Sequence, residues 1–212
     1  MNVQGLYAIA DSAWNPCGSL EELVRRYVTG GARIVQLRMK NAAAAGATWD
    51  DDCFTAARAI MVLKRETPFT FIINDYVDVA AEVHADGVHV GAGDMPVDEV
   101  KRRIRPDMFV GYSSHALDEA RAAEARGADY VAFGAIYPTP TKGAGHPVQG
   151  LEKLREVVAA LHVPVVAIGG ITRANIDEVK ATGVASVAMI SALCNAENIA
   201  EEVQWFENKF GQ

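Results

Sequence analysis

The sequence predicts an α/β protein built as a single (β/α)8 barrel, the TIM-barrel fold. Short apolar segments alternate with longer amphipathic segments along the whole chain, which makes about eight βα units. This alternation is typical of a parallel sheet with right-handed crossover helices, and eight units favour closure of the sheet. The length of 212 residues fits one compact barrel domain over residues 1–212. An open doubly wound sheet is the alternative architecture.

The predicted strands are short runs rich in β-branched, aromatic and small residues. In chain order they cover residues 6–10, 34–38, 71–74, 87–90, 109–113, 130–134, 165–168 and 186–190. Helices are predicted between and after them, over residues 19–29, 49–65, 77–83, 96–103, 117–126, 151–161, 174–181 and 199–210. Two helix starts carry local signals. Ser19 and Glu22 have the spacing of a capping box, and Pro96 stands in a first turn, where proline is tolerated.

Glycines mark the joints between a predicted helix and the strand that follows it. They stand at Gly31, Gly87, Gly127 and Gly183. Because glycine readily adopts the left-handed conformation that ends many helices, each of the four is expected to terminate its helix in this way. The joints support the predicted boundaries of the barrel units.

Composition and charge argue against several classes of function. Lys and Arg total 20 against 27 Asp and Glu, a net charge of −7 without a basic patch, so nucleic acid is not an expected partner. Cys17, Cys53 and Cys194 are too far apart for a disulfide framework or a zinc pattern. Neither a signal peptide nor a membrane span is expected. We therefore expect a soluble, cytoplasmic protein that acts on small molecules, and the pairing of outer helices would allow a homo-oligomer.

The second strand ends in an amide and two cations, Gln36, Arg38 and Lys40. Functional sites of barrels lie at the C-terminal ends of the strands. Alternate residues of a strand point to the same side, so the three side chains are expected to face the mouth of the barrel. They suit a phosphorylated ligand, because arginine binds oxyanions with a planar fork. The alternative is a polar strand end whose charges are solvated.

Two carboxylates follow the ends of neighbouring strands. Asn74 and Asp75 end the third strand, and Asp94 comes three residues after Gly91, which follows the fourth. Mg²⁺ takes one or two protein carboxylates and completes its octahedron with water and phosphate oxygens, so Asp75 and Asp94 could share this ion. The alternative is that both side chains cap the helices that follow, which does not exclude metal binding.

The stretch after the sixth strand, residues 138–142 with the sequence PTPTK, carries two hydroxyls and an ammonium group. Its two prolines favour extended backbone in the residues before them. Thr139 and Thr141 are therefore expected to share a side, with Lys142 at the end of the run. These groups can form an anion site, and the alternative is a surface loop with a solvated lysine.

The remaining strand ends add smaller donors. Ser113 ends the fifth strand and could donate to a phosphate, and His115 follows as a lone histidine that is open to a structural role. Gly169 and Gly170 follow the seventh strand and Ser191 follows the eighth. Glycines at a helix start expose N–H groups, and loops after strands seven and eight commonly bind phosphate in barrels. The residues thus predict a barrel that joins or rearranges phosphorylated small molecules.

These segments together resemble the thiamine-phosphate synthase family. The resemblance runs over nearly the whole chain in the family's order, and its most specific parts are Q-L-R-x-K and P-T-x-T-K. The matching segments are QLRMK at 36–40, IND at 73–75, ADGVHVGAGD at 85–94, SSH at 113–115, PTPTK at 138–142, VVAIGGI at 165–171 and MIS at 189–191.

The resemblance implies a Mg²⁺-dependent transferase. It would join 4-amino-5-hydroxymethyl-2-methylpyrimidine diphosphate to thiazole phosphate, with pyrophosphate leaving before the thiazole nitrogen attacks, and yield thiamine phosphate. It implies that Asp75 and Asp94 bind Mg²⁺ and that Gln36 hydrogen-bonds the aminopyrimidine. The groups implied for the diphosphate are Arg38, Lys40, Asn74, Ser113 and Lys142, and the catalytic candidates are these without Asn74. The groups implied for the thiazole phosphate are Thr139, Thr141, Gly170, Ile190 and Ser191.

The chain departs from the family pattern after the fourth strand. The family often has Gly-Gln-x-Asp there, whereas residues 91–94 read GAGD, so Ala92 replaces the glutamine amide. Three rival interpretations remain open. A related thiazole tautomerase would use His115 as an acid–base group, although that branch tends to lose the PTxTK and metal-site residues that are intact here. A non-catalytic barrel that binds thiamine phosphate and a sugar-phosphate epimerase or lyase are the others.

Overall fold

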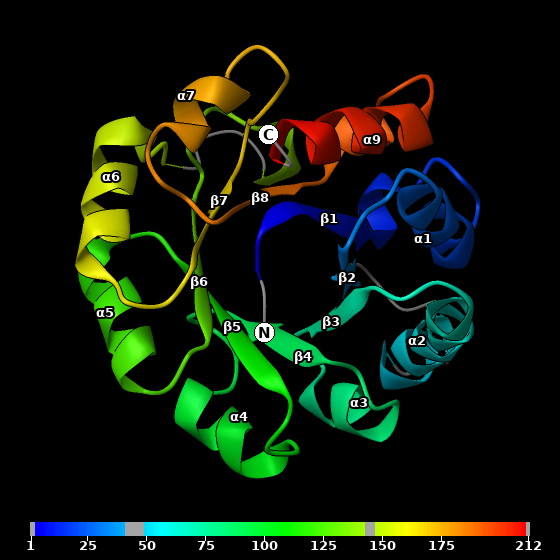
Figure 1. Ribbon diagram of the computed structural model, residues 1–212. Coiled ribbons are helices and arrows are strands. Elements are labelled where there is room, and N and C mark those ends of the chain that lie inside the picture. Colours follow the sequence, from blue (N-terminus) through cyan, green and yellow to red (C-terminus); the bar gives the residue numbers. More distant parts are fainter. Residues whose placement is uncertain (1–2, 41–48, 143–146, 211–212) are drawn as a thin grey trace.

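Eight parallel strands form a closed barrel, which confirms the predicted fold class. In the computed structural model, which describes residues 3–40, 49–142 and 147–210, neighbouring strands follow one another in chain order and β1 pairs with β8 (Figure 1). The side chains of Trp49, Asp50 and Lys142 lie outside this description. The strands are β1 (Gly5–Asp11), β2 (Ile34–Arg38), β3 (Thr70–Asn74), β4 (Gly87–Val90), β5 (Phe109–Ser114), β6 (Tyr130–Gly134), β7 (Val165–Ile168) and β8 (Ser186–Met189).

Helices form a ring outside the strands (Figure 1). They are α1 (Leu20–Thr29), α2 (Trp49–Glu66), α3 (Val77–Glu82), α4 (Val97–Arg103), α5 (Leu117–Ala125), α6 (Gly150–Ala160), α7 (Ile176–Lys180), α8 (Ser191–Cys194) and α9 (Ile199–Phe210), with 3-10 turns η1 (Ser12–Trp14) and η2 (Pro140–Lys142). Within the described ranges, no helix combines the length and apolar character that crossing a membrane requires.

Alternation along the strands separates two apolar layers, because successive side chains point to opposite faces. One layer packs between the strands and the helices and includes Leu6, Val35 and Leu37. The other fills the barrel and contains Val3, Tyr7, Ile9, Ile34, Ile72, Phe109, Tyr130, Ala132, Val166 and Ala188. Further along β2, β3 and β4 the inward positions become polar, with Gln36, Asn74 and His89 buried there. These three strands therefore present buried polar groups toward their carboxyl ends.

The Ser19 half of the predicted capping box forms at the N-terminus of α1. Ser19 has extended backbone, and its hydroxyl accepts a hydrogen bond from the Glu22 N–H at 3.1 Å. The Glu22 carboxylate contacts the next turn, where it accepts from Arg26 Nε at 3.0 Å. A side-chain cap of this kind typically stabilises a helix by about 1 kcal/mol.

The prediction for the joint glycines is correct at three positions and wrong at the fourth. Gly31, Gly127 and Gly183 have φ values of +91°, +95° and +87°, as expected of helix-ending glycines. At the remaining joint His84 takes the left-handed conformation, with φ of 59°. Gly87 is instead required by packing, because a Cβ there would lie 2.4 Å from the Phe109 ring.

The chain after β8 also differs from the prediction. A continuous strand was expected over residues 186–190, but β8 ends at Met189 and the four-residue α8 begins at Ser191. The change occurs at Ile190, whose φ of −120° and ψ of −81° leave the extended region. This turn brings Ile190 and Ser191 to the rim of the barrel mouth.

Candidate active site

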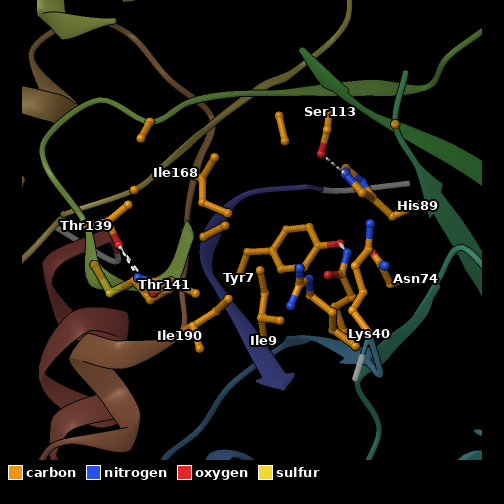
Figure 2. Close-up of a pocket in the computed structure, with 18 of the residues that line it drawn as sticks. Tyr7, Ile9, Lys40, Asn74, His89, Ser113, Thr139, Thr141, Ile168 and Ile190 are labelled. Atoms are coloured by element: carbon orange, nitrogen blue, oxygen red, sulfur yellow. Dashed lines mark hydrogen bonds between the residues drawn. The ribbon is translucent and has the colours of Figure 1, made fainter. Parts of the chain in front are cut away.

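The carboxyl ends of the strands surround a cavity of about 350 Å³. In Figure 2, Thr139 and Thr141 lie on one side of it and Ser113, Asn74 and Lys40 on the other. The sequence-predicted site residues that line it are Gln36, Arg38, Lys40, Asn74, Asp75, Asp94, Ser113, Thr139, Thr141, Gly170, Ile190 and Ser191. The remaining predicted residue is Lys142, whose side chain lies outside the described residues. Segments from all over the chain therefore meet in one place, as the barrel prediction requires.

Arg38 is held by a carboxylate that sequence reasoning missed. Asp11, at the end of β1, is fully buried, and its Oδ2 accepts a hydrogen bond from Arg38 Nη1. Its Oδ1 accepts from the Ala13 N–H at 2.8 Å, which begins η1. Register brings the pair together, because Asp11 is the partner of Arg38 in the β1–β2 ladder. Asp11 thus fixes the orientation of the guanidinium. The Arg38 side chain is 23% exposed and lines the cavity, so it remains open to a ligand.

Lys40 and the two predicted metal ligands form an adjoining charged group. Lys40 Nζ lies 3.1 Å from Asp75 Oδ2, and Asp94 Oδ2 accepts from the Gly91 N–H at 2.8 Å. The pKa of Asp75 is raised from 3.8 to about 6, chiefly because burial disfavours the charged carboxylate. Lys40 opposes this shift, whereas the neighbouring Asp94 carboxyl, to which Asp75 is hydrogen-bonded, adds to it. The carboxyl groups of Asp75 and Asp94 therefore lie next to each other in a partly desolvated part of the cavity.

The helix-capping alternative for these carboxylates is wrong. The N-cap positions of α3 and α4 are Tyr76 and Pro96, and neither helix has a side-chain cap hydrogen bond. Asp75 instead has a φ of 66°, a left-handed conformation that is uncommon for residues other than glycine. Non-glycine residues in this region often mark functional sites. The two side chains face the cavity rather than the helix ends.

Asn74 presents a donor that the described part of the protein leaves unsatisfied. The residue is only 6% exposed, and its Nδ2 has no hydrogen-bond partner there. An unsatisfied buried donor costs about 1–3 kcal/mol. Because Asn74 lines the cavity, a ligand that carries an acceptor would satisfy this group.

A row of buried hydrogen bonds crosses the barrel beneath the cavity. Gln36 Nε2 donates to the Tyr7 hydroxyl at 2.8 Å, and the hydroxyls of Tyr7 and Tyr130 are 2.7 Å apart. His89 Nδ1 lies 2.9 Å from the Tyr130 hydroxyl, and His89 Nε2 lies 2.8 Å from Ser113 Oγ. The sequence reasoning did not assign roles to the two tyrosines or the histidine. Their inward positions on predicted strands were the available signal.

The PTPTK segment brings its hydroxyls together by a different route from the one predicted. Extended backbone was expected, but residues 140–142 form the 3-10 turn η2. Thr139 Oγ1 accepts from the Thr141 N–H at 3.3 Å and lies 3.2 Å from Thr141 Oγ1. Both threonines line the cavity because the Thr139 hydroxyl closes a turn onto the Thr141 N–H. The predicted alternation of an extended strand does not continue here.

The glycines after β7 also differ from their predicted setting. They do not begin a helix, since α7 starts at Ile176. Gly169 and Gly170 have φ values of 99° and 68°. A Cβ on Gly170 would lie 2.5 Å from the Pro138 carbonyl oxygen, so only glycine lets this loop lie against the PTPTK segment. Gly170, Ile190 and Ser191 line the same side of the cavity.

His115 lies at the rim of the cavity at the start of the β5–α5 connection. Its backbone N–H donates to Glu119 Oε2 at 2.9 Å, and its ring Nδ1 lies 3.8 Å from the same oxygen. Ala92 also lines the cavity, in the turn that departs from the family pattern. His115 is therefore tied to its own helix as well as facing the cavity.

Comparison with known proteins decides the family. A family model described as thiamine monophosphate synthase matches residues 6–193, a range that includes every predicted site residue. The chain belongs to the thiamine monophosphate synthase family. The resemblance drawn from the sequence motifs is thereby confirmed.

Relatives within the thiamine monophosphate synthase family match most of the chain. A thiamine-phosphate synthase of Pyrococcus furiosus is 40% identical over 199 residues, which cover 94% of this chain and 91% of the relative. One from Moorella thermoacetica is 42% identical over 180 residues, which cover 84% and 82%. A solved structure of thiamine phosphate pyrophosphorylase from Pyrococcus furiosus matches with a TM-score of 0.83 and 38% identity, and the match covers 98% of this chain and 96% of that one.

These relatives are named as synthases, which are transferases. The matches favour this branch of the thiamine monophosphate synthase family over a thiazole tautomerase and over a non-catalytic barrel. They also agree with the presence of the PTxTK segment and both aspartates, which the tautomerase interpretation would not require.

Proposed function

We propose that this chain condenses 4-amino-5-hydroxymethyl-2-methylpyrimidine diphosphate with thiazole phosphate to give thiamine phosphate and pyrophosphate. The observation that carries the proposal is the content of the cavity. Its β2–β5 side combines cations, amides and a serine with two carboxylates, and its β6–β8 side carries threonines and glycine-rich backbone. Two phosphorylated substrates need two such groups of residues beside each other.

The proposal includes Mg²⁺ held by Asp75 and Asp94. The two carboxyl groups fit a cation, because they lie side by side and the pKa of Asp75 is raised by burial and by the Asp94 charge. Within the described ranges, they belong to no cluster of three or more His, Cys, Asp or Glu side chains. Two carboxylates are enough for Mg²⁺, which takes one or two from the protein and completes its shell with water and phosphate oxygens. When bound, the ion would neutralise charge on the leaving diphosphate.

Side chains on the β2–β5 side are assigned to the diphosphate. Arg38, fixed by Asp11, can bind two phosphate oxygens with its planar fork. Lys40, whose Nζ lies 3.1 Å from Asp75 Oδ2, adds a second positive charge, and Asn74 Nδ2 is a buried donor without a partner among the described residues. Ser113 adds a hydroxyl. Lys142, which ends the PTPTK segment after β6, is assigned to the diphosphate from the family resemblance.

The proposed reaction is dissociative. The C–O bond between the pyrimidine methylene and the diphosphate breaks, and both electrons leave with the diphosphate. The electron-rich aminopyrimidine stabilises the resulting carbocation, and the lone pair of the thiazole nitrogen then forms the new C–N bond. This chemistry needs no protein nucleophile. The residues contribute by neutralising developing charge and by holding the two rings in contact.

The remaining cavity residues are assigned to orientation. Gln36 would hydrogen-bond the aminopyrimidine above the apolar surface made by Ile9, Ala132 and Ala188. The groups assigned to the thiazole phosphate are Thr139, Thr141, Gly170, Ile190 and Ser191. The apolar surface excludes water from the carbocation, which would otherwise be captured as an alcohol.

One assay tests the proposal. Both substrates are supplied with Mg²⁺, and thiamine phosphate and pyrophosphate are separated and quantified. We expect equal amounts of the two products, formed only when both substrates and the metal are present. The folded protein yielding neither product would refute the proposed function. Arg102→Ala, a change on the exposed face of α4, serves as a control that should leave the rate unchanged.

A further inference from the structure

A chain of hydrogen bonds joins two residues that the proposed function assigns to different parts of one substrate. It runs from Gln36 through Tyr7, Tyr130 and His89 to Ser113, with successive heavy-atom distances of 2.8, 2.7, 2.9 and 2.8 Å. Figure 2 shows Tyr7, His89 and Ser113 along this path. Gln36 and Ser113 lie on β2 and β5, which do not pair with each other. The chain therefore offers a physical link between two separate contacts.

The middle of the chain is closed to solvent. Tyr130, Tyr7 and His89 are 0%, 1% and 5% exposed. Burial raises the pKa of both tyrosines, so each phenol keeps its proton. Gly111 makes room for the arrangement, because a Cβ there would lie 2.0 Å from Tyr130 Cζ. Because water does not reach these residues, the direction of each hydrogen bond is set by the donors and acceptors at the two ends of the chain.

The order of the protons follows from the donor at one end. The Tyr7 hydroxyl accepts from Gln36 Nε2, so its single proton is available to Tyr130. Tyr130 then donates to His89 Nδ1. A neutral imidazole has one donor and one acceptor. In that form the order places the His89 proton on Nε2, which lies 2.8 Å from Ser113 Oγ and would donate to it. The Ser113 proton is left to point into the cavity.

We propose that Tyr7, Tyr130 and His89 are positioning residues that turn the Ser113 hydroxyl proton toward the diphosphate, and that Gln36 sets this direction. The inference rests on the proposed function, because the diphosphate is the anion assigned to Ser113. A hydroxyl that donates to a phosphate oxygen stabilises it, whereas one that donates inward presents only lone pairs to the anion and repels it.

The same chain couples recognition of the two ends of the substrate. When Nε2 of Gln36 donates to Tyr7, its Oε1 is the atom that remains to accept from the amino group of the pyrimidine. A 4-oxo pyrimidine offers an acceptor instead, and the Gln36 amide would have to turn its NH₂ to the ligand. Tyr7 would then donate to Gln36, every bond in the chain would reverse, and Ser113 would donate to His89. The chain thus selects a 4-amino pyrimidine and a diphosphate together.

The first test measures the position of the His89 proton. Long-range ¹H–¹⁵N spectra distinguish the two neutral tautomers, and His89→Gln identifies the signals among the five histidines. We expect the proton on Nε2 in the unaltered protein, and a growing share on Nδ1 in Gln36→Leu, which lacks the terminal donor. A proton on Nδ1 in the unaltered protein would overturn the proposed direction.

The second test measures binding of inorganic pyrophosphate with Mg²⁺ by calorimetry, without any pyrimidine present. Tyr130→Phe removes the donor to His89, so pyrophosphate affinity should fall about fivefold, part of the value of one hydrogen bond to a charged acceptor. Tyr7→Phe leaves that donor in place and should change the affinity less. Tyr112→Phe is the matched control, since Tyr112 is on β5 but packs in the outer layer. Equal affinities in Tyr130→Phe and Tyr112→Phe would refute the proposal.

The two hypotheses fail in different ways. If the unaltered protein makes no thiamine phosphate, the proposed function is wrong, whatever the tautomer of His89. If it makes the product and Tyr130→Phe binds pyrophosphate normally, the function stands and the proton-ordered chain is wrong. If Tyr130→Phe does not fold, the tautomer measurement on the unaltered protein still decides the direction.

Discussion

Arg38→Met removes the cation that faces the buried Asp11 carboxylate. Asp11 is fully buried, and its Oδ2 accepts from Arg38 Nη1. Methionine keeps most of the apolar stem of the arginine side chain, so packing around β2 changes little. The loss then falls mainly on the carboxylate, which keeps its hydrogen bond from the Ala13 N–H at 2.8 Å but loses its counter-charge.

The size of the effect follows from burial. Removing one partner of a buried ion pair costs about 3–5 kcal/mol. The Arg38 side chain is 23% exposed, and nearby solvent reduces the cost, so we expect the lower end of about 3 kcal/mol. For a chain of this length this corresponds to a drop in Tm of about 6–12 °C.

A second substitution separates stability from function. In the double variant that combines Asp11→Asn with Arg38→Met, the buried charge is gone, and the amide oxygen of the introduced side chain can still accept from the Ala13 N–H. This variant should recover most of the lost stability, about 2 kcal/mol, because no uncompensated charge remains. Its affinity for pyrophosphate with Mg²⁺ should stay as low as in Arg38→Met. Denaturant unfolding and calorimetry measure the two quantities. A double variant no more stable than Arg38→Met would refute the buried-charge argument.

Three further predictions concern the cavity and the barrel interior. Lys142→Ala should slow turnover far more than it lowers the melting temperature, because its proposed partner is the leaving diphosphate; an unchanged rate would show that Lys142 is an ordinary surface residue. Asp94→Asn should shift the Mg²⁺ dependence of the rate to higher concentrations, and an unchanged Mg²⁺ titration would remove Asp94 from the metal site. Gly111→Ala should destabilise the fold by about 3 kcal/mol in denaturant unfolding, because the new Cβ would lie 2.0 Å from Tyr130 Cζ; a variant of normal stability would show that the ring moves freely.

Much of the site could be predicted because it follows from short-range order. Alternation along β2 and into the two residues after it predicts that Gln36, Arg38 and Lys40 share a side, and all three line the cavity. Asp75 and Asp94 follow the ends of two paired strands, and parallel strands end at the same edge of a sheet. Local pattern and the barrel topology together were enough for these positions.

Other parts of the site depend on contacts that no local pattern records. Tyr7 and Tyr130 are 123 positions apart, yet their hydroxyls are 2.7 Å apart. Asp11 meets Arg38 because of the register between β1 and β2. The capping role considered for the aspartates was wrong for a similar reason. Asp75 adopts a left-handed backbone beside Lys40 and Asp94, where tertiary contacts outweigh the local preference for a cap.

The sequence by itself determined the barrel, the order of its units and which side chains would face the mouth. Those features depend on the period of two along strands and on the helical periodicity between them, both of which are local. Only the tertiary structure decided that Gln36 and Ser113 are joined by a buried hydrogen-bonded chain, and that Asp11 orients Arg38. Closure of the barrel sets the stagger of every strand at once. Distances across its interior are therefore properties of all eight strands together rather than of any one segment.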